Sequence, residues 1–132
     1  MMVRTLLIIS AWASILALAF ATLTDVGFVY SIYHKVAPLL MRPGMRIYAH
    51  FEHVIAFAVF GALFAFAYPK HLIFVCSIVL ISAVALEYMQ TLTPDRHGTL
   101  IDAVEKVVGG ALGIFAAQVI LWFTKNRRRF QN

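Results

Sequence analysis

LIFVCSIVLISAVALEYMQ, residues 72–90, is the most informative stretch for the fold, because its hydrophobic run ends on polar residues before it is long enough to cross a bilayer. As a helix, Leu72 to Leu86 would reach about 22 Å, whereas the hydrocarbon core is roughly 30 Å thick. Glu87 and Gln90 follow at helical spacing and share a face. A carboxyl group at that depth needs a cationic partner or a proton. Such groups cost a few kcal/mol unless paired or hydrated, so they usually mark a site.

Two further hydrophobic runs behave in the same way. Val54 to Pro69 and Val107 to Thr124 would reach about 24 and 27 Å as helices. The residues that complete them are Glu52 and His53 before the first run, and Asp102, Glu105 and Lys106 before the second. Because successive spans alternate in direction, the polar extensions of all three runs fall on one side of the bilayer. We therefore expect a single charged cluster just inside one leaflet.

The composition indicates a membrane protein. Of the 132 residues 62% are hydrophobic, and the mean hydropathy is +0.85, which is far above that of a soluble domain. The prediction is an all-α, polytopic membrane protein with four transmembrane helices in a compact bundle. Residues 1–132 form a single membrane domain with spans at about 5–24, 49–68, 71–91 and 100–124. The lone cysteine, Cys76, has no disulfide partner in the chain.

The first segment has a competing interpretation. Arg4, the apolar stretch after it and the small residues at Ala19 and Ala21 resemble a secretory signal with a cleavage site. The run from Thr5 to Thr24 is long for a signal core and suits a span. Cleavage would leave the orientation of the other three helices unchanged.

The positive charges predict the topology. The net charge is +5, and four positive residues directly follow the last span, which is typical of a cytoplasmic flank and not of a nucleic-acid surface. With both termini in the cytoplasm, the inside carries Arg4, Lys70, Lys125, Arg127, Arg128 and Arg129. The outside then carries Lys35, Arg42, Arg46 and Arg96. The charged cluster would therefore face the extracytoplasmic side, and membrane lipids become the expected partners.

The loop before the last span contributes further candidate residues. Pro94, Asp95 and Gly98 predict a turn, and Thr99 is placed to cap the following helix, with Asp102 at the acidic position of a capping box. Arg96 and His97 lie beside that helix N-terminus, whose free amides favour anions. An arginine in this place could hold a phosphate or carboxylate.

Residues on the last span indicate pairing and close packing. Lys106 is a candidate charge partner for Glu87 or Asp102. Gly109 and Gly113 form a GxxxG pair, which lets another helix approach closely. His50 and His53 at i and i+3 could bind a metal, but this spacing alone is weak evidence and no cysteine is nearby, so no metal or other cofactor is predicted.

Together these motifs resemble the signature of VanZ-like bacterial membrane proteins over residues 50–117. The resemblance rests on Glu87 and Gln90, the turn with Arg96, Asp102 with the glycines after it, and His53 followed by an aromatic and small face. The chain differs where the family has Asn before the glycines (Lys106), Gly in the turn (Asp95), and an Asp-Lys pair ahead of the histidine (Ala49 and His50). The resemblance implies four helices in the bacterial inner membrane, in a family named for glycopeptide resistance.

The leading functional hypothesis is a polar pocket in the outer leaflet that binds an envelope lipid headgroup or a lipid-linked precursor. Its predicted ligand-binding residues are Glu52, Gln90, Arg96, His97, Asp102 and Lys106. The alternative is a hydrolase or transferase acting on a lipid phosphate or glycan linkage, with His53 and Glu87 as acid and base. An accessory protein that binds another membrane protein or forms a homo-oligomer, and a proton-coupled carrier, also fit the sequence.

Overall fold

A computed structural model describes residues 2–23, 48–92 and 99–129, and they are helical apart from short connections. The helices are α1 (Met2–Leu23), α3 (Tyr48–Ala67), α4 (Leu72–Thr91) and α5 (Leu100–Arg129). The all-α prediction is confirmed. The helix ends follow the expected spans, except that α5 runs on to Arg129, because the basic tail contains no proline or glycine to stop it.

Three of these helices are long and apolar enough to cross a membrane: Met2–Leu23, Leu72–Thr91 and Leu100–Arg127. The apolar part of α3, Glu52–Ala67, is shorter. Large apolar side chains cover the outside of the helices, such as Ile73, which is 85% exposed, and Leu16, which is 74% exposed. An apolar exterior of this kind is expected where lipid is the solvent.

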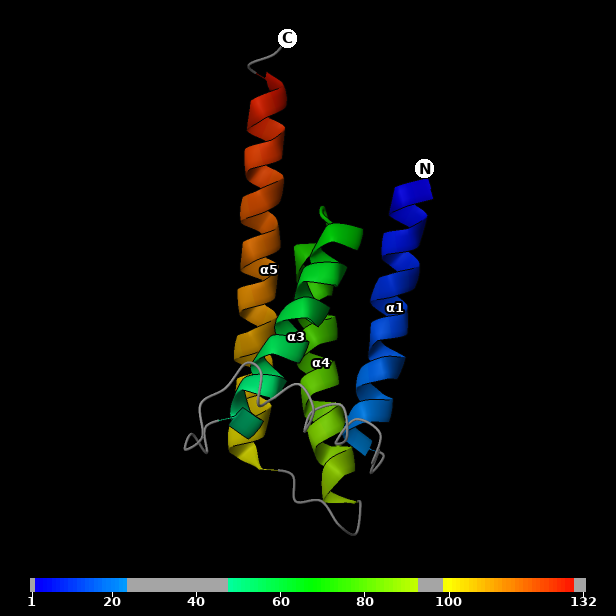
Figure 1. The fold of residues 1–132 in the computed structure, drawn as a ribbon, viewed down its shortest axis with the longest axis vertical. Coiled ribbons are helices and arrows are strands. Elements are labelled where there is room, and N and C mark those ends of the chain that lie inside the picture. Colours follow the sequence, from blue (N-terminus) through cyan, green and yellow to red (C-terminus); the bar gives the residue numbers. More distant parts are fainter. Residues whose placement is uncertain (1, 24–47, 93–98, 130–132) are drawn as a thin grey trace, which may run out of the picture.

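The helices alternate in direction. Figure 1 shows α1 and α4 running one way and α3 and α5 the other, so that both chain termini lie at the same end. The reversal between α3 and α4 is a tight turn, in which the amide of His71 donates to the carbonyl of Tyr68 at 3.0 Å. Pro69 lies inside this turn and cannot continue α3. The other ends of α3 and α4 are thereby brought to the opposite end of the molecule.

The contact between α3 and α5 is close because glycines face backbone. A Cβ atom added at Gly109 would lie 2.8 Å from the Cα of Val54, and one at Gly113 would lie 2.8 Å from the Cα of Ala58. At Gly61 on α3 the neighbour is the backbone of Gly110. Gly109 faces Val54 and Gly113 faces Ala58, so the residue numbers of these two pairs rise in the same direction, and the two helices are parallel. This glycine contact fixes the first turns of α3 beside the first turns of α5.

Aromatic rings fill the interior around α3. Phe57, Phe60 and Phe64 are at most 1% exposed and meet edge to face, with centroids 5.6 and 5.1 Å apart. The indole of Trp12 on α1 packs edge-on against Phe64 and donates a hydrogen bond of 2.9 Å to the hydroxyl of Tyr68. The rings hold α1 to α3 by packing, and this half of the interior carries no charge among the described residues.

Candidate functional site

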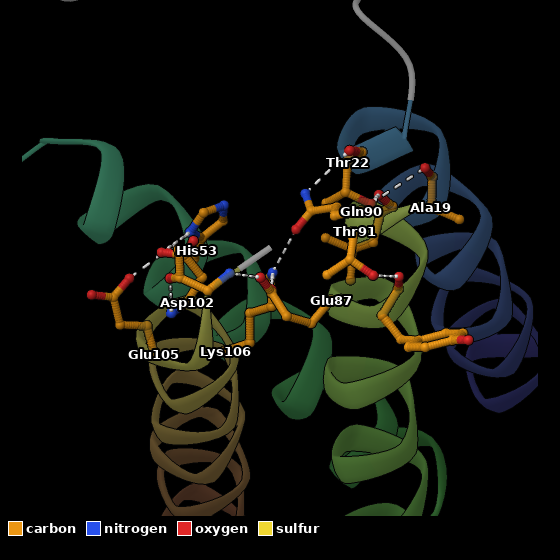
Figure 2. A network of polar contacts seen from close by, with 12 residues as sticks. Ala19, Thr22, His53, Glu87, Gln90, Thr91, Asp102, Glu105 and Lys106 are labelled. Atoms are coloured by element: carbon orange, nitrogen blue, oxygen red, sulfur yellow. Dashed lines mark hydrogen bonds and ion pairs between the residues drawn. The ribbon is translucent and has the colours of Figure 1, made fainter. Parts of the chain in front are cut away.

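Polar side chains from different helices meet at the end away from the chain termini. The C-terminal turn of α1, the start of α3, the end of α4 and the start of α5 all reach this end (Figure 1). Figure 2 shows that its polar residues fall into two groups, one on either side of the start of α5. The sequence prediction that these polar extensions lie on one side therefore agrees with the arrangement of the helices.

The first group is built on a buried ion pair. Lys106 on α5 is fully buried, and its Nζ atom contacts Oε2 of Glu87 on α4. The same ammonium group donates to Oε1 of Gln90 at 3.1 Å. Glu87 is thus one of the two partners that the sequence indicated for Lys106. A lysine in an apolar interior is stable only with such partners, because removing an unpaired charge from water is costly.

The second oxygen of Glu87 completes the N-terminus of α5. The backbone amide of Thr99 donates to Oε1 of Glu87 at 2.6 Å, and the amide of Asp102 donates to the Thr99 hydroxyl at 3.2 Å. Thr99 therefore caps α5, as the sequence indicates. In a capping box the acid at Asp102 would receive the Thr99 amide. Here the carboxylate of Glu87 receives it, because a buried carboxylate needs donors and α4 brings it within reach.

Gln90 ties α1 to this group. Its amide nitrogen donates to the backbone carbonyl of Thr22 at 3.2 Å, in the last turn of α1, where carbonyls lack helical partners. We call Thr22, Glu87, Gln90, Thr99 and Lys106 the interior network. It links α1, α4 and the start of α5. In each of its side-chain contacts a hydrogen-bond donor meets an acceptor.

The second group joins α3 to α5. The Nδ1 atom of His53 lies 3.9 Å from Oδ1 of Asp102 and 3.9 Å from Oε2 of Glu105. The three side chains are partly exposed, at 28%, 20% and 18%. A separation of 3.9 Å is too long for a hydrogen bond. We call His53, Asp102 and Glu105 the His–carboxylate cluster.

The predicted site residues separate between these groups. His53 and Asp102 belong to the cluster, and Glu87, Gln90 and Lys106 belong to the network (Figure 2). Glu52 is exposed and makes no hydrogen bond or ion pair with another residue that the structure describes. Arg96 and His97 lie outside the described residues.

The structure adds a residue that was not among the predicted ligands. Glu105 was recognised only as a polar residue before the last span, yet its carboxylate lies beside His53. The signal was present in the sequence, because Asp102 and Glu105 are three residues apart and share a helix face. Gly109 and Gly113 lie one and two turns farther on, against the backbone of α3. They hold α3 close enough for His53 to reach both carboxylates.

Two surface cavities lie elsewhere. One, of about 510 Å³, is a groove between α4 and α5 lined by residues such as Val79, Ala111 and Ile114. The other lies on the outer face of α4, beside Ile81 and Val84. Both are apolar, and neither is lined by a residue of the network or of the cluster.

No known family, curated protein or solved structure matches this chain. Its class therefore rests on its own fold. The described residues form an all-helical protein in which three helices are long and apolar enough to cross a membrane.

Proposed function

We propose that this chain is a VanZ-like, multi-pass protein of the bacterial inner membrane. Its polar end would bind the headgroup of an envelope lipid or of a lipid-linked precursor in the outer leaflet. The observation that carries the proposal is the partly exposed His–carboxylate cluster, set at the end of otherwise apolar helices. Ionisable groups at this depth are expensive and are usually retained for a function.

The two polar groups support different roles. Lys106 was expected to hold phosphate, but its ammonium group is buried and engaged by Glu87 and Gln90. The interior network therefore suits a structural role. The cluster is open to the outside, and its carboxylates and imidazole could bond the hydroxyl or ammonium groups of a headgroup. Arg96, which precedes α5, remains the other residue predicted to contact phosphate.

The proposed topology has four spans and cytoplasmic termini. Both termini lie at one end, together with Lys70 and the basic tail of α5, which fits the positive-inside rule (Figure 1). α3 and α4 contain 20 residues each and are joined by a tight turn. A helix of 20 residues is about 30 Å long, so α3 can also cross, with Glu52 and His53 just inside the outer leaflet.

The contacts give less support to the enzymatic alternative with His53 and Glu87 as acid and base. A general base and its partner must lie within hydrogen-bond reach, directly or through one water. His53 faces Asp102 and Glu105, whereas Glu87 is engaged by Lys106 and Thr99. Binding is therefore the function we propose.

Native mass spectrometry of protein gently extracted from its own membrane tests this proposal. The wild type is compared with His53→Ala and Arg96→Ala. His71→Ala is the matched control, because His71 is exposed in the turn at the other end. We expect a co-purifying lipid or lipid-linked glycan in the wild type and the control, with at least about a fivefold lower bound fraction in the other two variants.

Equal lipid retention in all four proteins would contradict a headgroup site at the polar end. If no form retained lipid and the spectra showed a second protein or a homo-oligomer, the accessory-protein hypothesis would replace this one.

A further inference from the structure

The three side chains of the His–carboxylate cluster present ligand atoms to one point. Nδ1 of His53, Oδ1 of Asp102 and Oε2 of Glu105 all lie within 4.8 Å of one another. Two ligands of one ion with bonds of about 2.1 Å can be at most about 4.2 Å apart. The two nitrogen–oxygen separations of 3.9 Å already meet that limit. Small side-chain rotations would bring the two carboxylate oxygens together as well.

The imidazole nitrogen at the centre of the cluster supplies a second observation. Nδ1 of His53 is shielded from solvent and has no hydrogen-bond partner. A buried polar atom of this kind is normally satisfied, so it calls for an explanation. An ion between Nδ1 and the two carboxylates would use its lone pair directly. Figure 2 shows the imidazole turned toward Asp102 and Glu105.

Charge and donor type point to the class of ion. The carboxylates of Asp102 and Glu105 repel each other, and a divalent cation between them would balance their negative charges. Imidazole nitrogen favours transition metals over Mg²⁺ and Ca²⁺, and carboxylates complete such sites. Asp102 and Glu105 also take part in other interactions, which a bound ion would share or displace.

We propose that His53, Asp102 and Glu105 form a binding site for a divalent transition-metal ion of the Zn²⁺ or Mn²⁺ type. Three protein ligands leave coordination positions open to water or to an external oxygen. All three side chains are partly exposed, although Nδ1 of His53 and Oε2 of Glu105 are themselves shielded, so an ion would enter as these side chains rotate. The inference concerns the ion alone, and it holds or fails whichever ligand the polar end binds.

The site is carried by regular helices, which makes it well defined. Asp102 and Glu105 are three residues apart on α5, and His53 lies in the second turn of α3. The glycine contact at Gly109 holds the two helices together just beyond the cluster. Sites on packed helices keep their ligands in place better than sites on loops. Glu87 is excluded as a fourth ligand because Lys106 neutralises it.

Metal binding to the purified protein tests the proposal without any lipid. The full chain, prepared in detergent without a polyhistidine tag and stripped with a chelator, is titrated with Zn²⁺ and, separately, with Mn²⁺ by calorimetry. We expect one ion per chain for at least one of the metals. His53→Ala, Asp102→Asn and Glu105→Gln should each weaken binding at least about tenfold, while His71→Ala should leave the affinity unchanged.

The proposal is overturned if neither metal binds, or if folded His53→Ala and Glu105→Gln proteins bind as tightly as the wild type. Size-exclusion chromatography shows which variants are folded. The two carboxylate variants keep the imidazole, so the test does not depend on His53→Ala alone. Lipid retention is not measured here, so the outcome leaves the headgroup proposal to its own experiment.

Discussion

The interior network and the His–carboxylate cluster use the same kinds of side chain in opposite ways. In the network, the fully buried Lys106 is matched by Glu87 and Gln90, and Glu87 also bonds the Thr99 amide. In the cluster, His53 faces two carboxylates at 3.9 Å. Both groups meet at the start of α5, where Asp102 and Glu105 of the cluster and Lys106 of the network lie within five residues of one another along the chain. The two groups differ in burial. The fully buried Lys106 must be matched by an opposite charge, whereas the three side chains of the cluster are partly exposed.

The comparison implies that the network residues stabilise the fold more than His53 of the cluster does. Stability measurements on single variants can therefore test this difference between the two groups. Each variant below is compared with a control of similar chemistry elsewhere in the molecule.

The largest loss of stability is expected for Lys106→Met. The substitution removes the only cation that contacts the buried Glu87 among the described residues and leaves its carboxylate unpaired. Breaking a buried pair from one side costs about 3–5 kcal/mol. The free energy of unfolding can be measured in mixed detergent micelles by SDS titration. Lys70→Met, in the exposed turn after α3, is the control and should change stability little. A wild-type unfolding curve for Lys106→Met would remove the structural role of the network.

Gly109→Leu should have the next largest effect. A Cβ atom there meets the backbone of Val54, which cannot rotate away, so α3 and α5 must separate. The expected cost is about 2–3 kcal/mol, together with loss of metal binding because His53 moves away from α5. Ala116→Leu introduces the same side chain at an exposed position of α5 and serves as the control. Equal behaviour of the two variants in thermal unfolding would contradict close packing at Gly109.

Thr99→Ala is expected to cost about 1 kcal/mol. It removes the hydroxyl that accepts a hydrogen bond from the Asp102 amide, but it keeps the Thr99 amide that donates to Glu87. Thr124→Ala is the control, because the Thr124 hydroxyl only bonds a carbonyl within its own helix. SDS titration resolves a difference of this size. A cost for Thr99→Ala close to that for Lys106→Met would mean that the hydroxyl, and not only the amide, belongs to the network.

The smallest effect on stability is expected for His53→Gln. Nδ1 of His53 makes no hydrogen bond that the substitution could break, so unfolding should change by less than about 0.5 kcal/mol. Metal affinity should nevertheless fall. His71→Gln, at the other end, should change neither quantity. If His53→Gln destabilised the protein by several kcal/mol, the cluster would have to be counted with the network.

Much of the fold was accessible from the sequence. The hydrophobic runs predicted four helices within a few residues of their ends. The shortest apolar run was expected in α4, from Leu72 to Leu86, whereas α3 is the helix whose apolar part falls below the length for a span. Thr99 was correctly expected to cap α5. The division of the polar residues into a network and a cluster could not be predicted from the sequence. The Thr99 amide donates to Glu87, whereas the capping box would have it donate to Asp102. Glu105 lies with Asp102 beside His53.

The sequence by itself determined which segments are helices, their alternating directions and the collection of polar residues at one end. Those properties follow from hydrophobic length and from local signals such as Pro69 and Thr99, which act within a few residues. Which charged side chains contact one another depends on the tertiary structure. Helical spacing places a side chain on a face, but its partner depends on how closely the helices approach and rotate. The glycine contact between α3 and α5 sets that distance for His53, which meets Asp102 and Glu105. Gly110 of α5 faces Val79 of α4, and on that side of α5 Lys106 meets Glu87.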